Sequence, residues 1–227
     1  MIKTKKGIAS TVFILLVPLA LSYLSPSIFG VFAGLVSRNS EAVSNAISKY
    51  IAYILAFNYV IAFCIALLRM KKQGVAFCDV GVSKKSFNVK HIFLAVILGI
   101  GCFVFLNLLP DILGIYKQTS PTNSEGGFMF FVSSITLAPI AEEFIFRGYG
   151  ISLLKGKLPV WATVLIPSVC FSLIHIYMGV ANVIWALVAG IILSIFFLKT
   201  KNCVACMIAH FCMNFSIGLM YAVIAFQ

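Results

Sequence analysis

A series of long apolar runs constrains the fold of this chain more than any other feature of its sequence. Seven segments, each near the ~20 residues that a membrane-spanning helix needs, are separated by short polar or basic stretches. They cover residues 8–30, 50–68, 91–109, 128–152, 160–180, 183–198 and 203–225. Only 10% of the residues are charged and 62% are hydrophobic, whereas soluble domains carry about 25% charged residues. We predict an all-α, polytopic transmembrane helical bundle of about seven spanning helices, built as a single membrane-embedded domain over residues 1–227.

The first segment leaves the number of spans open between six and eight. A lysine-rich start and an apolar run from Ile8 to about Leu24 resemble a signal peptide, but apolar residues resume at 28–36 without a clear small-residue cleavage site. A break at Ser25-Pro26 would instead divide residues 8–36 into two passes. We favour a single, uncleaved first helix.

Basic residues are distributed unevenly between alternate connections, which predicts the topology. If the N-terminus is cytoplasmic, three basic residues lie outside (Arg38, Lys49 and Lys117) and thirteen lie inside: Lys3, Lys5, Lys6, Arg69, Lys71, Lys72, Lys84, Lys85, Lys90, Lys155, Lys157, Lys199 and Lys201. Cytoplasmic loops of membrane proteins carry such an excess. The net charge of +11 therefore reflects topology, and we expect no nucleic acid partner. Membrane lipids are the expected partner, with anionic headgroups beside the basic loop 69–90.

Two of the six acidic residues stand side by side inside the fourth apolar segment, at Glu142 and Glu143. A charge at such depth is costly and marks a candidate functional site. Arg147 follows Glu143 by four residues, so the two side chains share a helix face and can pair. Glu142 lies ~100° further round the helix. We therefore predict that Arg147 neutralises Glu143 and leaves Glu142 free to react.

Two histidines also lie within apolar segments, each four residues from a second notable side chain. His175 follows Phe171, and His210 precedes Asn214. Each pair shares one face of its predicted helix. A single histidine in such a place is more often a packing residue, but two histidines, an asparagine and a glutamate pair on three helices indicate an active site.

These side chains permit two kinds of hydrolytic site. Glu142, His175 and His210 could bind Zn²⁺, whose catalytic sites use three protein ligands and keep one position open. Alternatively, Glu142 and His175 could activate water without a metal, while His210 and Asn214 donate hydrogen bonds to an oxyanion. No His-Glu-x-x-His motif is present, so the sequence leaves both readings open.

The three motifs, in this order on successive apolar segments, resemble the CPBP family of intramembrane endopeptidases. This family comprises CAAX prenyl proteases and bacteriocin-processing (Abi) proteins. Glu-Glu-x-x-x-Arg, Phe-x-x-x-His and His-x-x-x-Asn appear in the family's order, and the surrounding Pro139–Gly148 sequence also fits. The resemblance covers about residues 128–220, the expected catalytic core. Residues 1–127 carry no recognisable motif and are expected to form accessory helices.

The resemblance implies a role for each motif residue. Glu142 and His175 would activate the attacking water, His210 and Asn214 would form the oxyanion hole, and Glu143 and Arg147 would hold the site. Family members are commonly called metalloproteases, although these roles need no metal.

The family also implies the kind of substrate. It would be a membrane-associated peptide or a lipidated protein such as a prenylated CAAX protein. The short chain favours the bacterial branch, which is linked to bacteriocin processing or immunity, and hence a multi-pass protein of the bacterial plasma membrane. The alternative is a non-enzymatic membrane immunity or scaffold protein that uses the Glu-Arg and His-Asn pairs as interhelical hydrogen bonds.

The heights of the two histidines along their helices impose one geometric requirement. At 1.5 Å per residue from the cytoplasmic ends, His175 lies ~24 Å along its helix and His210 only ~10 Å. We therefore expect the fifth helix to start later, near Val164, or to tilt at Pro167.

Overall fold

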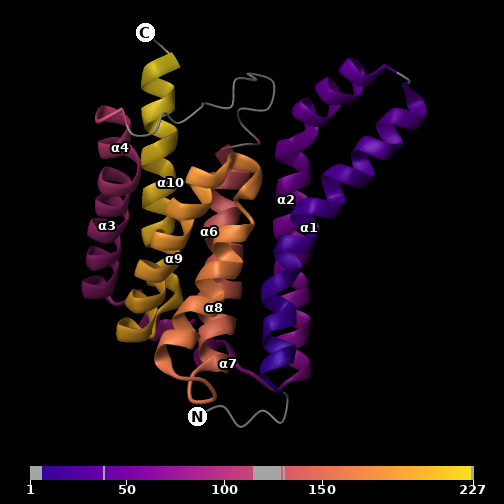
Figure 1. Cartoon of the computed structure of the whole chain (residues 1–227). Coiled ribbons are helices and arrows are strands. Elements are labelled where there is room, and N and C mark those ends of the chain that lie inside the picture. The colour runs from indigo at the N-terminus through magenta and orange to yellow at the C-terminus, as the bar shows by residue number, and fades with distance from the viewer. Residues whose placement is uncertain (1–6, 38, 115–128, 130, 226–227) are drawn as a thin grey trace.

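The computed structural model describes residues 7–37, 39–114, 129 and 131–225 and shows a bundle of helices (Figure 1). No β-strand occurs within these residues. Five of the described helical stretches are long and apolar enough to cross a membrane: 8–36, 49–72, 89–112, 180–200 and 203–220. The predicted all-α membrane bundle is therefore confirmed, and the chain is an integral, multi-pass membrane protein.

The first two helices form a long hairpin beside the rest of the bundle (Figure 1). Helix α1 spans Ile8–Val36 and α2 spans Ser40–Lys72. Pro18 and Pro26 both lie inside α1, so the chain does not divide at Ser25-Pro26 and one helix covers the first apolar segment. The Asn39 side chain caps α2 by accepting hydrogen bonds from two backbone amides of its first turn, as N-cap residues do.

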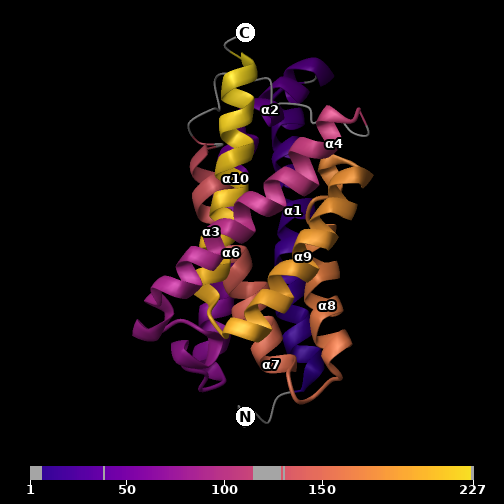
Figure 2. The same ribbon diagram turned by 90° about the vertical axis from the view of Figure 1, so that its left-hand side faces the viewer.

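A short polar connection then leads into a third helical rod. It contains two 3₁₀ turns, η1 (Phe77–Val80) and η2 (Lys84–Phe87). The rod that follows is continuous from α3 (Val89–Phe103) through the π-helix η3 (Val104–Leu108) to α4 (Leu109–Ile112). It lies on the outside of the bundle against α10, as Figure 2 shows from the side.

The fourth apolar segment forms the axis of the bundle. It consists of the π-helix η5 (Phe131–Leu137), α6 (Ala138–Glu142), the π-helix η6 (Glu143–Ile151) and α7 (Ser152–Leu154). Helices α1, α2, α8, α9 and α10 all pack on it, and every residue from 141 to 151 is buried. π-Helical turns are rare and frequently mark functional sites.

The last three helices differ from the predicted pattern at one point. Helix α8 (Val160–Leu173) is followed by the 3₁₀ turn η7 (Ile176–Met178), α9 (Val180–Thr200) and α10 (Cys203–Ala225). Helices α8 and α9 pack together as the predicted hairpin. However, the segment expected over 160–180 is helical for only 14 residues, about 21 Å, which is shorter than the ~30 Å hydrocarbon core.

Most basic residues in the described parts of the chain gather at one end of the bundle, as the topology prediction requires. They occupy the last turns of α2 and α9, the turn η2 and the α7–α8 connection. All four regions lie at the end of the bundle where α8 and α10 begin (Figures 1 and 2). This end is therefore the expected cytoplasmic face.

Labelling of Cys78 tests this orientation. The thiol is free and exposed on η1, so we expect a membrane-impermeant maleimide to react with it from the cytoplasmic face only. Inverted and right-side-out vesicles should be compared, with Cys78→Ser as the control that loses the label. Equal labelling from the opposite face would contradict the topology.

Gly99 sets the close approach of α3 to α10. A Cβ atom at this position would overlap the backbone oxygen of Ala209 and lie 2.8 Å from the Cβ of Cys212. Both neighbours are fixed parts of α10 and cannot rotate away. The glycine therefore lets α3 press against the stretch of α10 that carries His210.

We predict that Gly99→Ala lowers the thermal stability of the purified protein, because α3 must move away from α10. Forced overpacking of this kind costs about 1–3 kcal/mol. Gly101→Ala is a matched control two residues away, since nothing lies within 4 Å of the added Cβ. Equal melting temperatures for the two variants in the same detergent would show that the α3–α10 contact is not tight.

Candidate active site

The two glutamates and the arginine of the first motif lie at the buried axis of the bundle. Glu142 ends α6 and is 2% exposed, while Glu143 and Arg147 belong to η6 and are 0% exposed. Buried charges persist only when they are paired or hydrogen-bonded. Their partners therefore determine what each group can do.

Arg147 is held from three sides. Its Nη1 donates to Glu143 Oε1 at 2.7 Å, which is the pair predicted from spacing, and its Nη2 donates to the backbone carbonyl of Gly190 in α9 at 3.2 Å. The guanidinium carbon also lies 4.4 Å from the centre of the Phe171 ring in α8, which stabilises a cation. Gly190 allows this approach, because a Cβ there would lie 3.2 Å from Phe171.

His210 joins the two glutamates. Its Nδ1 lies 2.9 Å from Glu143 Oε1, and its Nε2 lies 3.9 Å from Glu142 Oε2. A carboxylate can only accept, so Nδ1 carries the proton in this hydrogen bond. The Nε2 atom is thereby directed at Glu142 with a gap that a water molecule can bridge. The sequence did not predict that His210 contacts Glu143.

His175 reaches the same region from the end of α8. Its Nδ1 donates to the backbone carbonyl of Phe171 at 3.0 Å, which leaves Nε2 unprotonated in the neutral ring. The Phe171 ring centre lies 5.0 Å from that of His175 and 5.8 Å from that of His210. Both histidines therefore pack against the same phenylalanine.

The end of α8 reaches the level of His210 in a different way from the one predicted. Helix α8 begins at Val160 rather than near Val164. In both views the turn that precedes α8 lies further toward the expected cytoplasmic end than the turn between α9 and α10 (Figures 1 and 2). Because α8 starts lower, the far end of this short helix reaches the level of His210. The expected later start was wrong, and an axial offset of the helix replaces it.

Asn214 lies one turn beyond His210 on α10. Its Nδ2 donates to the backbone carbonyl of Ser134 in η5 at 2.8 Å. An amide nitrogen carries two hydrogens, so the second one remains for another acceptor. The asparagine thus ties α10 to the axial helix while keeping one donor.

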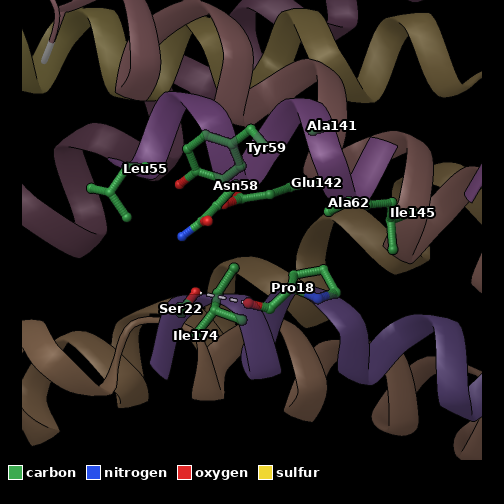
Figure 3. A pocket seen from close by; sticks show the side chains of 10 residues that line it. All are labelled: Pro18, Ser22, Leu55, Asn58, Tyr59, Ala62, Ala141, Glu142, Ile145 and Ile174. Carbon is green, nitrogen blue, oxygen red and sulfur yellow. Dashed lines mark hydrogen bonds between the residues drawn. The ribbon is translucent and has the colours of Figure 1, made fainter. Parts of the chain in front are cut away.

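Glu142 faces a small cavity between the axial helix and the α1–α2 hairpin (Figure 3). The cavity is small and has room for about one water molecule. Neither carboxylate oxygen of Glu142 has a hydrogen-bond partner among the described residues. A buried carboxylate in this state has a strong requirement for a donor, which a water molecule meets.

The possible Zn²⁺ ligands Glu142, His175 and His210 do not form a ligand set in this arrangement. No group of three or more His, Cys, Asp or Glu side chains in the described parts of the chain is spaced to hold a metal ion. The Nδ1 atoms of both histidines are engaged, by Phe171 and Glu143, so only their Nε2 atoms could serve as metal ligands. We therefore derive no step through a metal.

Sequence reasoning missed the residues that α1 and α2 contribute to the cavity. Asn58 and Tyr59 of α2 and Pro18 and Ser22 of α1 line it opposite Glu142 (Figure 3). No motif marks these positions. Asn58 is a polar residue within an apolar segment, which was the one available signal.

We predict that Arg147→Met destabilises the protein by about 3–5 kcal/mol, because Glu143 then stays buried without its cation. Adding Glu143→Gln should recover part of this loss, since the second change removes the unpaired charge. Thermal unfolding in detergent measures both effects. Arg69→Met is the control: Arg69 is half-buried and donates to the Ser10 hydroxyl, so its loss should cost little. If the double variant loses as much stability as Arg147→Met and Glu143→Gln lose when made separately and added together, the two groups do not act as a pair.

Comparison with known families gives one match. Residues 124–216 match the family described as type II CAAX prenyl endopeptidase Rce1-like. No curated protein and no solved structure shows a significant match. The matched segment contains all seven residues of the three motifs, and it coincides with the axial helix and α8, α9 and most of α10. Over this segment, the chain is similar to the Rce1-like type II CAAX prenyl endopeptidases of the CPBP family.

Proposed function

We propose that this protein is an intramembrane endopeptidase that hydrolyses a peptide bond of a membrane-associated or prenylated, CAAX-type substrate. The observation that supports it best is Glu142, a buried carboxylate whose oxygens have no hydrogen-bond partner in the described structure and which faces a water-sized cavity. The family points to a CAAX-type protease, and this carboxylate is suited to activating water.

The proposed reaction begins with a water molecule beside Glu142. The carboxylate accepts a proton from the water, and the water oxygen bonds to the carbonyl carbon of the substrate. As the tetrahedral intermediate collapses, the C–N bond breaks and Glu142 returns the proton to the leaving nitrogen. General acid–base catalysis of this kind contributes about 10²–10⁴ in rate.

His175 and His210 take different parts in this proposal. The Nε2 of His175 is free to accept, so this residue orients or deprotonates the water. His210 is anchored to Glu143 through Nδ1, as the histidine of a catalytic triad is anchored to its carboxylate. His210 Nε2, which lies 3.9 Å from Glu142 Oε2, is the proposed donor to the negative charge that develops in the intermediate.

Asn214 is the second proposed donor to the oxyanion. Its remaining amide hydrogen would stabilise the oxygen of the tetrahedral intermediate together with His210. Preorganised donors of this kind typically contribute 10²–10³ in rate.

We further propose a bacterial plasma membrane location, with bacteriocin processing or immunity as the biological setting. Whether cleavage depends on Zn²⁺ is tested by adding a metal chelator to the assay.

We predict that Glu142→Ala and His175→Ala each abolish cleavage of a farnesylated CAAX peptide by the protein reconstituted in lipid vesicles. The reason is that each variant removes a group proposed to activate water. Chromatographic separation of the cleaved tripeptide measures the reaction, with and without a metal chelator. Full activity of Glu142→Ala would refute the assignment.

Matched controls are available for both variants. Glu41→Ala changes an exposed glutamate in the first turn of α2, and His91→Ala changes a histidine in the first turn of α3. Both should keep wild-type activity. If protection against a bacteriocin survives Glu142→Gln while cleavage is absent, the non-enzymatic immunity reading replaces the protease.

A further inference from the structure

The α1–α2 hairpin lies outside the segment that matches the family, yet it forms one wall of the cavity in front of Glu142. Pro18 and Ser22 come from α1, and Asn58 and Tyr59 come from α2 (Figure 3). The matched segment supplies the opposite wall, including Glu142 itself. The cavity is therefore completed by a part of the chain to which no role has been assigned.

Most polar groups of this wall are already engaged. The Ser22 hydroxyl donates to a backbone carbonyl one turn earlier in α1 at 2.8 Å. The Asn58 carboxamide donates to another α1 carbonyl at 3.3 Å and accepts from the Ser25 hydroxyl at 2.7 Å. Within the described structure, the Tyr59 hydroxyl has no hydrogen bond of this kind to α1, so it is a donor in this wall that can serve Glu142.

The position of Tyr59 suits that role. Figure 3 shows its ring beside the Glu142 side chain, and both residues line the cavity. They do not reach hydrogen-bond geometry, since both oxygens of Glu142 lack a partner. One bridging water, or a small rotation of either side chain, completes the contact.

We propose that Tyr59 is a positioning residue for the proposed protease, and that it donates a hydrogen bond to Glu142 directly or through the water in the cavity. Glu142 Oε2 faces His210 on one side, and Tyr59 acts from the side of α2. The carboxylate is then held between two donors from different helices. This inference rests on the proposed function and adds a role for the N-terminal hairpin.

Asn58 explains how Tyr59 is kept in place. It is 5% exposed, and its two hydrogen bonds to α1 fix the rotation of α2 about its own axis at this level. Because Tyr59 is the next residue along the helix, its direction follows from that constraint. The pair of helices thus presents the phenol to the cavity as a preformed unit.

Tyr59→Phe tests the proposal, because it removes the hydroxyl and keeps the ring. With a farnesylated CAAX peptide and vesicle-reconstituted protein, we expect kcat to fall about 10- to 100-fold, the usual worth of a hydrogen bond to a charged group, while KM stays within about 2-fold. Activity is normalised to folded, monodisperse protein, so that a lower yield does not count as a lower kcat.

Tyr149→Phe is the matched control. Its hydroxyl donates to Gln73 at 2.9 Å, so it also joins the axial helix to the end of α2 but does not face Glu142. We expect its kcat to remain near the wild-type value. A KM effect alone in Tyr59→Phe, or an equal kcat loss in both variants, would overturn the positioning role.

The role of Tyr59 and the protease assignment are distinguished by different outcomes. If Glu142→Ala is inactive and Tyr59→Phe has the kcat of the wild type, the role of Tyr59 is wrong and the protease assignment stands. If Glu142→Ala is fully active, the protease assignment itself fails.

Discussion

A guanidinium buried at the axis of a membrane bundle needs a counter-charge and hydrogen-bond acceptors, and much of this fold is arranged around Arg147. Glu143 supplies the counter-charge from the same helix, α9 supplies a carbonyl, and α8 supplies the face of Phe171. Three helices are thereby fixed around one side chain. Since breaking a buried pair costs several kcal/mol, the relative positions of these helices are strongly specified.

This arrangement also divides the work between the neighbouring glutamates. Glu143 is occupied by Arg147 and His210, whereas Glu142 has no hydrogen-bond partner in the described structure and faces the cavity. Glu143, which anchors the site, and Glu142, which is proposed to react, are adjacent in the chain. A step of about 100° round the helix places one toward α9 and α10 and the other toward α1 and α2.

Spacing along single helices predicted which side chains of one helix pair, because it depends on local geometry alone. The pairing of Glu143 with Arg147 follows from a separation of four residues. Contacts between helices did not follow, since they depend on how each helix is rotated and how high it lies. Three features are of this kind: the bond from His210 to Glu143, the axial offset of α8 and the presence of Tyr59 in the cavity.

The fold was likewise predicted only in part. The apolar runs predicted the helices, but not that α8 would end at Leu173. The roles of the site residues, and the division into accessory helices and a catalytic core, stay predictions.

The location of the ion pair within one helix has a consequence for synthesis of the protein in the membrane. Helices α8, α9 and α10, which supply Phe171, the Gly190 carbonyl and His210, are made after the axial helix. When the axial helix leaves the ribosome, none of these partners exists yet. Arg147 and Glu143 nevertheless neutralise each other from the start, because they lie four residues apart on the same helix. The α1–α2 hairpin is already present to cover Glu142. The order of the chain therefore shields these charges from lipid at each stage of assembly.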